Sequence, residues 1–290
     1  MNRDSFINYH PLANVVFYVV VLFVAMFINH PVYQIISLLG ALIYGSVLGI
    51  VKLKSLLMMV PTMLMVIMIN VLFNHEGATI LVYLRNGNPI TLESIVFGVS
   101  FSIMLLSVLL WFATFNKVID SDKMSYLLGR FLPNIALLFS LLLRFIPKFN
   151  GQMKKTHEAQ SQLYGHEKSF VGKIKRSVMV FFITVTWAIE HHIESADSMK
   201  SRGYGVGKRT SFSIYQWTLR DFIVLTWTCL SGLILLVSTL SGGMRYSYFP
   251  LIMKVELFHY GYAVYGLLVM LPSLIRLYEE LEWKYYIQKV

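Results

Sequence analysis

Six apolar segments, each long enough to cross a lipid bilayer, place the strongest constraint on how this 290-residue chain folds. A spanning helix needs about 20 mostly apolar residues. Charged residues make up 14% of the chain, against roughly 25% in soluble domains. The sequence therefore predicts an all-α membrane protein with about six transmembrane helices, at roughly residues 13–28, 32–50, 55–73, 94–115, 221–240 and 258–277. Because only Asn29-His30-Pro31 separates the first two, we expect them to form a tight antiparallel pair.

Basic residues gather between the fourth and fifth segments. Of the 25 Lys and Arg residues, fifteen lie between Lys117 and Arg209. Basic loops beside spans mark the cytoplasmic side of a membrane protein. Lys52 and Lys54 mark the second connection in the same way, whereas the third has only Arg85. With six spans, the pattern predicts a multi-pass protein of the cell membrane with both termini in the cytoplasm.

The same basic region bears on possible partners. Such regions are typical of loops beside anionic lipid head groups. Aromatic and basic residues do not alternate here as they do in nucleic-acid binding surfaces, so the lipid bilayer is the expected partner and nucleic acid is not.

The charge and hydropathy patterns divide the chain into three parts. Residues 1–116 hold four membrane helices, and residues 221–290 hold two more and a cytoplasmic tail. Residues 117–220 form a cytoplasmic or interfacial insert that is too long for a simple connection. We expect three helical stretches in this insert. The first should be kinked or bounded at Pro133 and Pro147, the second should begin after Asn150-Gly151 and stop at Gly165, and the third should end at the glycines from Gly203 onward.

The third stretch ends in the polar sequence SADSMKSRGYG. An apolar stripe at helical spacing precedes it, formed by Val178, Phe182, Val185, Ile189, Ile193 and Ala196. At about 100° per residue, Arg202 falls away from that stripe, on the face of His191, Ser195 and Ser198. We therefore expect Arg202 to point outward. Two interpretations stay open: a cation that stabilises the helix macrodipole, or a guanidinium that binds carboxylates of a partner.

The order of motifs in the insert resembles that of a known family. The stretches LPNIALLFSLLLRFIPKF, HEAQSQLYG and SADSMKSRGYGVGKRT together resemble the transmembrane T component of energy-coupling-factor (ECF) transporters. That family has a membrane bundle with a cytoplasmic insert of long coupling helices. Two short Ala-Arg-Gly-like motifs end two of these helices, and each docks on one of two cytoplasmic ATPase subunits.

The two motifs match the family pattern unequally. Ser201, Arg202 and Gly203 fit the second motif, with Ser in place of Ala. Ala159, Gln160, Tyr164 and Gly165 occupy the first motif, but Tyr164 stands where the family has Arg. The basic partner there is either Lys154 or Lys155 upstream, or Tyr164 docks by packing.

The resemblance implies a non-catalytic subunit of an ATP-driven vitamin or micronutrient importer in a bacterial cell membrane. Its partners would be two ABC-type ATPases and a small membrane-embedded, substrate-binding S component. No catalytic residue, cofactor or metal site is implied. The Met-rich run LLMMVPTMLMVIMI offers an adaptable surface, either for differing S components or for ordinary lipid contact.

Two other functions compete with this interpretation. EAQSQLYG also faintly resembles the docking loop of conventional ABC permeases, which would predict one coupling loop and a solute path within the bundle. An intramembrane metal-dependent enzyme is the second competitor, because EHHIESAD supplies Glu190, His191, His192, Glu194 and Asp197. Neighbouring His191 and His192 point about 100° apart on a helix, which makes a joint metal site a poor fit.

Overall fold

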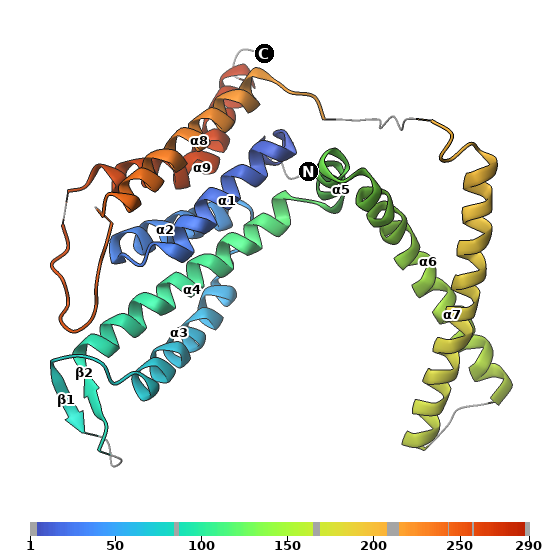
Figure 1. Cartoon of the computed structure of the whole chain (residues 1–290), viewed down its shortest axis with the longest axis horizontal. Coiled ribbons are helices and arrows are strands. Elements are labelled where there is room, and N and C mark those ends of the chain that lie inside the picture. The colour runs from blue at the N-terminus through green and yellow to red at the C-terminus, as the bar shows by residue number, and fades with distance from the viewer. Residues whose placement is uncertain are drawn as a thin grey trace. The chain divides into compact units, whose positions relative to one another are not determined.

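Helices make up most of the described chain, and the apolar segments determine where they lie (Figure 1). The computed structural model describes residues 5–83, 87–164, 169–207, 215–242, 244–256 and 258–287. The chain divides into two compact units. We call Met1–Lys123 together with Tyr215–Val290 the membrane unit, and Met124–Ile214 the insert unit.

The helices of the membrane unit coincide with the six apolar segments to within three residues, except that the last helix continues ten residues beyond its segment. They are α1 (Pro11–Phe27), α2 (Pro31–Val47), α3 (Leu53–Phe73), α4 (Leu92–Val118), α8 (Leu219–Leu240) and α9 (Tyr260–Ile287), preceded by a short 3₁₀ turn, η1 (Ser5–Asn8). Among the described residues, α4, α8 and α9 are long and apolar enough to span a bilayer, while α1, α2 and most of α3 are shorter apolar helices. The all-α membrane fold predicted from sequence is therefore confirmed.

The packing order of these helices differs from their order in the chain. α2 packs mainly against α4 and α9, α1 against α8 and α4, and α3 against α4. The direct contact between α1 and α2 is minor. The expectation of a tight α1–α2 pair is therefore wrong, because α4 and α9 take up most of the buried surface of α2.

The same His-Pro pair starts both α1 and α2. Pro11 and Pro31 occupy the first helical position, where a fixed φ suits the helix and the missing N–H costs nothing. His10 Nδ1 accepts a hydrogen bond from the Leu12 amide at 3.2 Å, and His30 Nδ1 accepts from the Val32 amide at 3.3 Å. Each imidazole thus satisfies an amide that the helix itself leaves unpaired.

A cluster of fully buried aromatic rings holds α1, α2 and α4 together. Trp111 of α4 contacts Phe17 and Tyr18 of α1 at ring-centroid distances of 6.0 and 6.2 Å, and Tyr44 of α2 at 6.4 Å. The indole N–H of Trp111 donates to Ser37 Oγ at 3.1 Å. Burial of apolar surface alone does not drive helices together in lipid, so close packing and such interhelical hydrogen bonds supply the specificity.

Small hydroxyl residues line the buried side of α4. Ser102, Ser107 and Thr114 are fully buried, and each hydroxyl donates to the carbonyl three residues earlier in the helix. Such residues let neighbouring helices approach closely without leaving a polar group unpaired. This explains why a spanning helix that packs on α1, α2 and α3 has so many serines.

A two-stranded hairpin connects α3 to α4, and the sequence did not predict it. β1 (Ile80–Tyr83) pairs antiparallel with β2 (Pro89–Thr91). The buried Glu93 carboxylate accepts hydrogen bonds from the amide and hydroxyl of Thr79, the latter at 2.6 Å. Glu93 therefore fastens the start of the hairpin to the first turn of α4.

The insert unit consists of two long helices and most of a shorter one. α5 (Ser121–Phe131) begins in the membrane unit, and α6 (Pro133–Tyr164) and α7 (Phe170–Ser201) pack against each other. α6 runs unbroken through Pro147 and through Asn150-Gly151. The expected boundary at Asn150-Gly151 is therefore wrong. The expected boundary at Pro133 is confirmed, since α5 ends at Phe131 and the ring of Pro133 disfavours helical backbone at Leu132.

Both ends of the insert leave the membrane unit beside the same N-terminal residues. Before the insert, Lys123 Nζ donates to the carbonyls of Ile7 and Val118. After it, the Asp221 carboxylate accepts from the His10 amide at 2.8 Å. The segment from Ile7 to His10 thus contacts the residues at both ends of the insert.

Candidate functional site

The predicted docking motifs belong to the α6–α7 pair, so the packing of that pair determines what they expose. The buried residues of α7 are Val180, Thr184 and Ala188. Thr184 is buried without a polar penalty because its hydroxyl donates to the Val180 carbonyl at 2.7 Å. At the far end of the contact, Phe145 of α6 lies 4.2 Å from the His192 ring centroid.

The apolar stripe expected to pack is a different one. Val178, Phe182, Ile189 and Ile193 are exposed in this chain, with Phe182 65% accessible. α7 has apolar side chains on two faces, and the narrower face with small residues is the one that fits against α6. The larger face is not covered by the described residues of the insert unit.

The end of α7 has a well-defined backbone conformation. Gly203 adopts φ +85°, its amide donates to the Lys200 carbonyl at 2.9 Å, and the Tyr204 amide donates to the Met199 carbonyl at 3.1 Å. These two bonds are the Schellman pattern, which needs a residue with positive φ and so favours glycine. The predicted helix end at Gly203 is confirmed.

This cap places Arg202 at the C-terminal rim of the helix. Arg202 is exposed, its amide donates to the Ser198 carbonyl at 3.3 Å, and Ser201 Oγ donates to the same carbonyl at 2.9 Å. Within the described residues, neither an ion pair nor a side-chain hydrogen bond involves the Arg202 guanidinium. Its five N–H donors are therefore available, beside a helix end whose partial negative charge favours a cation.

The residues of the first motif lie at the other end of the pair. Ala159 is exposed and Gln160 half-buried on α6, and Tyr164 is the last residue of that helix. Gly165 lies outside the described residues. Four residues separate Tyr164 from Ser169, the N-cap of α7, so the first motif lies near the start of α7 and the second at its end (Figure 1).

The histidines of α7 have aromatic neighbours. The His191 ring stacks on Trp187 at a centroid distance of 5.3 Å and an interplanar angle of 6°, and His192 lies against Phe145. The two imidazole centroids are 6.3 Å apart. Across the residues that the structure describes, no group of three or more His, Cys, Asp or Glu side chains is placed to hold a metal ion.

The membrane unit contains a buried polar network centred on Gln34 and Ser100. Gln34 is 1% exposed, and its amide nitrogen donates to Asn29 Oδ1 at 2.9 Å. Gln34 Oε1 accepts from Ser100 Oγ, which also bonds the hydroxyl of Tyr248 at 2.5 Å. The network joins α2, α4 and the segment before α9, which favours interhelical hydrogen bonding over a solute path as the role of Gln34.

Residues 7–214 match the family CbiQ, described as cobalt transport protein. The chain is also similar to the energy-coupling factor transporter transmembrane protein EcfT 1 of Listeria monocytogenes serotype 1/2a (strain 08-5578). The two are 33% identical over 113 residues, which cover 36% of this chain and 42% of the relative. This chain thus matches less than half of that relative's length.

The family match covers more than half of the chain, and it contains both α6 and α7. The matched relative is a transmembrane protein by name, in agreement with the apolar helices of the membrane unit. The chain therefore belongs to the CbiQ/EcfT family of T components and is a membrane component of a transporter.

Proposed function

We propose that this protein couples two cytoplasmic ABC-type ATPases to a small, substrate-binding S component in an importer of the ECF type. The arrangement of the two candidate motifs supports this most strongly. One lies near the start of α7 and the other at its end, and a helix of 32 residues at about 1.5 Å per residue is about 48 Å long. Two ATPase subunits could therefore dock without competing for the same surface.

The chemistry of the second motif suits a docking contact. The Schellman cap fixes the backbone on either side of Arg202, so little backbone entropy is lost when a partner binds. A planar guanidinium binds a carboxylate through two parallel hydrogen bonds. We propose an acidic groove on one ATPase as the partner of Ser201-Arg202-Gly203.

The first motif is proposed to dock differently. Lys154 and Lys155 are exposed on α6, one to two helical turns before Gln160. These two lysines supply the positive charge that the motif lacks because Tyr164 replaces the family's arginine. Ala159 leaves room for close approach of a partner backbone, so we propose a contact made by a lysine together with packing.

Contacts at one end of the membrane unit support a proposal for its orientation. Asp221 at the start of α8 contacts the start of α1, Lys123 contacts Val118 at the end of α4, and Arg276 of α9 contacts the Val47 carbonyl at the end of α2. The basic residues at these helix ends or in the loops next to them are Lys52, Lys54, Lys117, Lys123 and Arg220. Arg276 lies within α9 and adds a sixth basic residue at this end through its contact with Val47. We propose that this end faces the cytoplasm, as the distribution of basic residues favours.

Charge reversal at Arg202 tests the coupling role. In cells that express the transporter, Arg202→Glu should abolish co-purification of one ATPase and reduce uptake to background, while the amount of protein in the membrane stays normal. Arg245→Glu is the matched control, because Arg245 is also exposed but lies in the connection between α8 and α9. Normal uptake and normal ATPase recovery with Arg202→Glu would refute the docking role.

Combining substitutions at both motifs separates this proposal from a conventional permease. Lys154→Glu with Lys155→Glu should remove a contact that Arg202→Glu leaves in place, so each variant should retain part of the ATPase and the combined variant none. A permease with one coupling loop would instead lose all ATPase with the first-motif change and none with Arg202→Glu.

A further inference from the structure

The starts of α2 and α9 meet at one end of the membrane unit, and a histidine satisfies the first turn of each. His30 Nδ1 accepts from the Val32 amide at 3.3 Å, and His259 Nδ1 accepts from the Gly261 amide at 3.1 Å. Both imidazoles thus take the place of the side-chain oxygen that usually caps a helix. Two titratable rings therefore hold the beginnings of two helices that pack against each other.

One tyrosine of α9 joins these two histidines. The Tyr262 hydroxyl bonds His30 Nε2 at 3.2 Å and donates to the Glu256 carbonyl at 2.9 Å. The Tyr262 ring centroid lies 5.5 Å from that of His30 and 5.8 Å from that of His259. Tyr33 of α2 packs on the same tyrosine ring at 5.0 Å. The contact between the two helix starts is therefore built around Tyr262.

The hydrogen bonds of the two imidazoles determine where a proton can bind. Because Nδ1 accepts an amide hydrogen in both rings, the hydrogen of each neutral ring lies on Nε2. A second proton can bind only at Nδ1, where it meets the amide hydrogen of Val32 or of Gly261. The positive end of the helix dipole also repels a cation at this place. A protonated His30 ring must therefore leave its cap, and it then loses Tyr262 as well.

From this arrangement we propose that His30 and His259 form a proton-operated latch. While both rings are neutral, the latch holds the start of α9 against the start of α2. When the rings take up protons, both caps are lost and the contact opens. The two rings act together because both contact Tyr262, so release of one ring removes part of the packing that holds the other.

The groups around the latch favour its closed state at neutral pH. Among the described residues, the titratable groups that contact or face the two histidines are Tyr33, Tyr246, Tyr260, Tyr262 and Glu256. The tyrosines stay uncharged in this range. Burial, and then the neighbouring His259, lower the pKa of His30, while Glu256 opposes this. The stability of the closed state is therefore present above the ordinary pKa of about 6.5 and is lost as pH falls toward the folded value.

The segment before α9 depends on the same contact. Tyr246 packs on the His30 ring at 5.1 Å, and its neighbour Tyr248, 4.8 Å away, bonds Ser100 of α4. Opening of the latch therefore removes the support of Tyr246 and loosens the segment beside the buried network of Gln34. On the orientation proposed above, this end faces the outside of the cell, so the latch responds to external pH.

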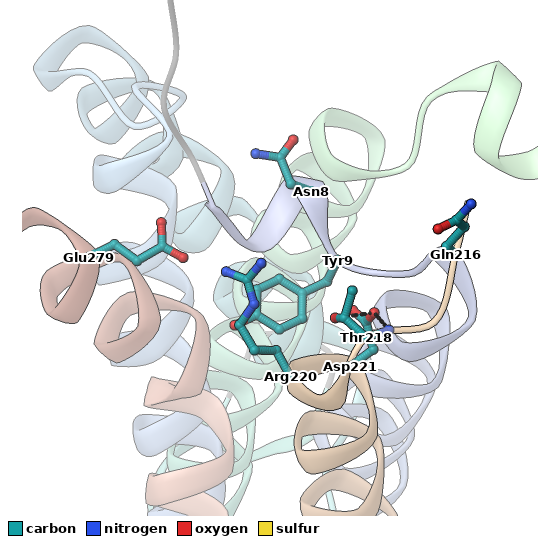
Figure 2. Close-up of a pocket in the computed structure, with 7 residues that line it drawn as sticks. All are labelled: Asn8, Tyr9, Gln216, Thr218, Arg220, Asp221 and Glu279. Carbon is teal, nitrogen blue, oxygen red and sulfur yellow. Dashed lines mark hydrogen bonds between the residues drawn. The ribbon is translucent and has the colours of Figure 1, made fainter. Parts of the chain in front are cut away.

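His10 is a histidine cap with different neighbours. Its ring stacks on Trp217, and its amide donates to the Asp221 carboxylate. Figure 2 shows this carboxylate bonded to Thr218 at the start of α8. The Leu12 amide, which His10 caps, therefore reports on a histidine cap that is not part of the latch, and it serves as an internal comparison.

Hydrogen exchange of the purified full-length chain in lipid nanodiscs tests the latch, across about pH 5 to 7.5, where imidazoles titrate. Each rate is divided by the intrinsic rate at the same pH to give a protection factor. Below about pH 6.5, protection of the Val32 and Gly261 amides should fall together by more than tenfold per pH unit, because each proton taken up on opening contributes about tenfold. Protection of the Leu12 amide should fall by about tenfold per pH unit at most.

Asparagine variants separate the two rings, since asparagine keeps a cap acceptor but does not titrate. In His30→Asn the Gly261 amide should lose about tenfold protection per pH unit at most, and in His259→Asn the same should hold for the Val32 amide. In the double variant neither amide should respond to pH. His157→Asn, at an exposed histidine of α6, is the matched control and should leave both profiles unchanged.

Three outcomes would overturn the inference. They are a slope of tenfold or less in the unaltered chain, a Gly261 profile that His30→Asn leaves unchanged, and an equal loss of protection at the buried Leu110 of α4, which would show global unfolding. If an asparagine variant fails to fold, imidazole NMR of the unaltered chain decides: His30 and His259 should titrate with one common midpoint, and two separate midpoints would refute the latch. These measurements need no ATPase, so the docking test at Arg202 does not bear on them.

Discussion

The backbone amide of His10 donates to the Asp221 carboxylate at 2.8 Å, across 211 positions of sequence. Asp221 is 3% exposed and also accepts from the amide and hydroxyl of Thr218. The His10 ring stacks on Trp217 at a centroid distance of 3.8 Å, just before the same helix. One carboxylate therefore caps α8 and fastens it to the start of α1.

Replacing Asp221 should destabilise the membrane unit. Asp221→Ala removes the cap of α8 and leaves the His10 amide without its carboxylate partner, at a cost of about 2 kcal/mol. Asp221→Asn keeps one acceptor oxygen and should cost less. Thermal unfolding of the purified protein in detergent ranks the stabilities of the unaltered protein and the two variants. Equal stability of the Ala and Asn variants would contradict the role of the hydrogen bond.

Gly203→Ala should loosen the end of α7. A side chain at φ +85° costs about 1–2 kcal/mol, so the Schellman bonds should open more often. Hydrogen exchange of the Tyr204 amide should speed up by about tenfold, since 1.4 kcal/mol corresponds to a factor of ten. Gly207→Ala is the control, because Gly207 has open space for a Cβ and no positive φ. Unchanged exchange at Tyr204 would mean that the bond to Met199 does not hold this turn.

Acidification should destabilise the start of α2 and its contact with α9. Burial, together with the nearby His259, lowers the pKa of His30, while Glu256 opposes this. The neutral ring accepts from the Val32 amide and contacts the Tyr262 hydroxyl at 3.2 Å. Because the folded-state pKa is lowered, the stability that His30 contributes is present above its ordinary pKa of about 6.5 and is lost as pH falls toward the folded value.

The measurement is the melting temperature between pH 5 and pH 7.5. His30→Asn keeps an acceptor for the Val32 amide and should flatten the dependence on pH. His157→Asn, at an exposed histidine of α6, should leave it unchanged. A His30→Asn protein that is as sensitive to acid as the unaltered one would exclude His30 as the source.

Gly40 should tolerate no side chain unless its neighbour shrinks. A Cβ at Gly40 would lie 1.8 Å from Val269 Cγ1, where α2 meets α9. Gly40→Ala should therefore destabilise by about 1–3 kcal/mol, and Val269→Ala should recover part of this loss in the double variant. Gly151→Ala is a useful contrast: it lies within α6 with open space around it, and should stabilise that helix by up to about 1 kcal/mol. If the changes in unfolding free energy caused by Gly40→Ala and Val269→Ala are additive in the double variant, the clash between these two residues is not the cause of the destabilisation.

Hydropathy was sufficient to predict the fold class and to locate the apolar helices of the membrane unit, with every bound within three residues except the end of α9. It could not predict helix neighbours, because α2 is apolar on several sides and only side-chain fit selects α4 and α9. For the same reason periodicity indicated the wrong face of α7: large apolar residues such as Phe182 dominate the pattern, yet the small residues around Thr184 make the close contact.

Local signals varied in how well they predicted structure. Gly203 ends α7 as expected, since positive φ at a helix end is a local requirement. Asn150-Gly151 does not break α6, because propensity is weak beside the packing of a long helix. The Asp221–His10 bond had no sequence signal, because the two residues are distant in the chain. The sequence identifies Arg202 as a candidate docking residue, but its role remains a prediction.

The shared position of Ile7 and His10 beside both ends of the insert has a mechanical consequence. Lys123 and Asp221 flank the insert, and both are bonded to one segment of four residues. On the coupling function proposed above, movement of the insert would therefore reach the membrane unit next to this one segment. We expect a bulky fusion placed just ahead of Ile7 to restrain the segment and slow transport.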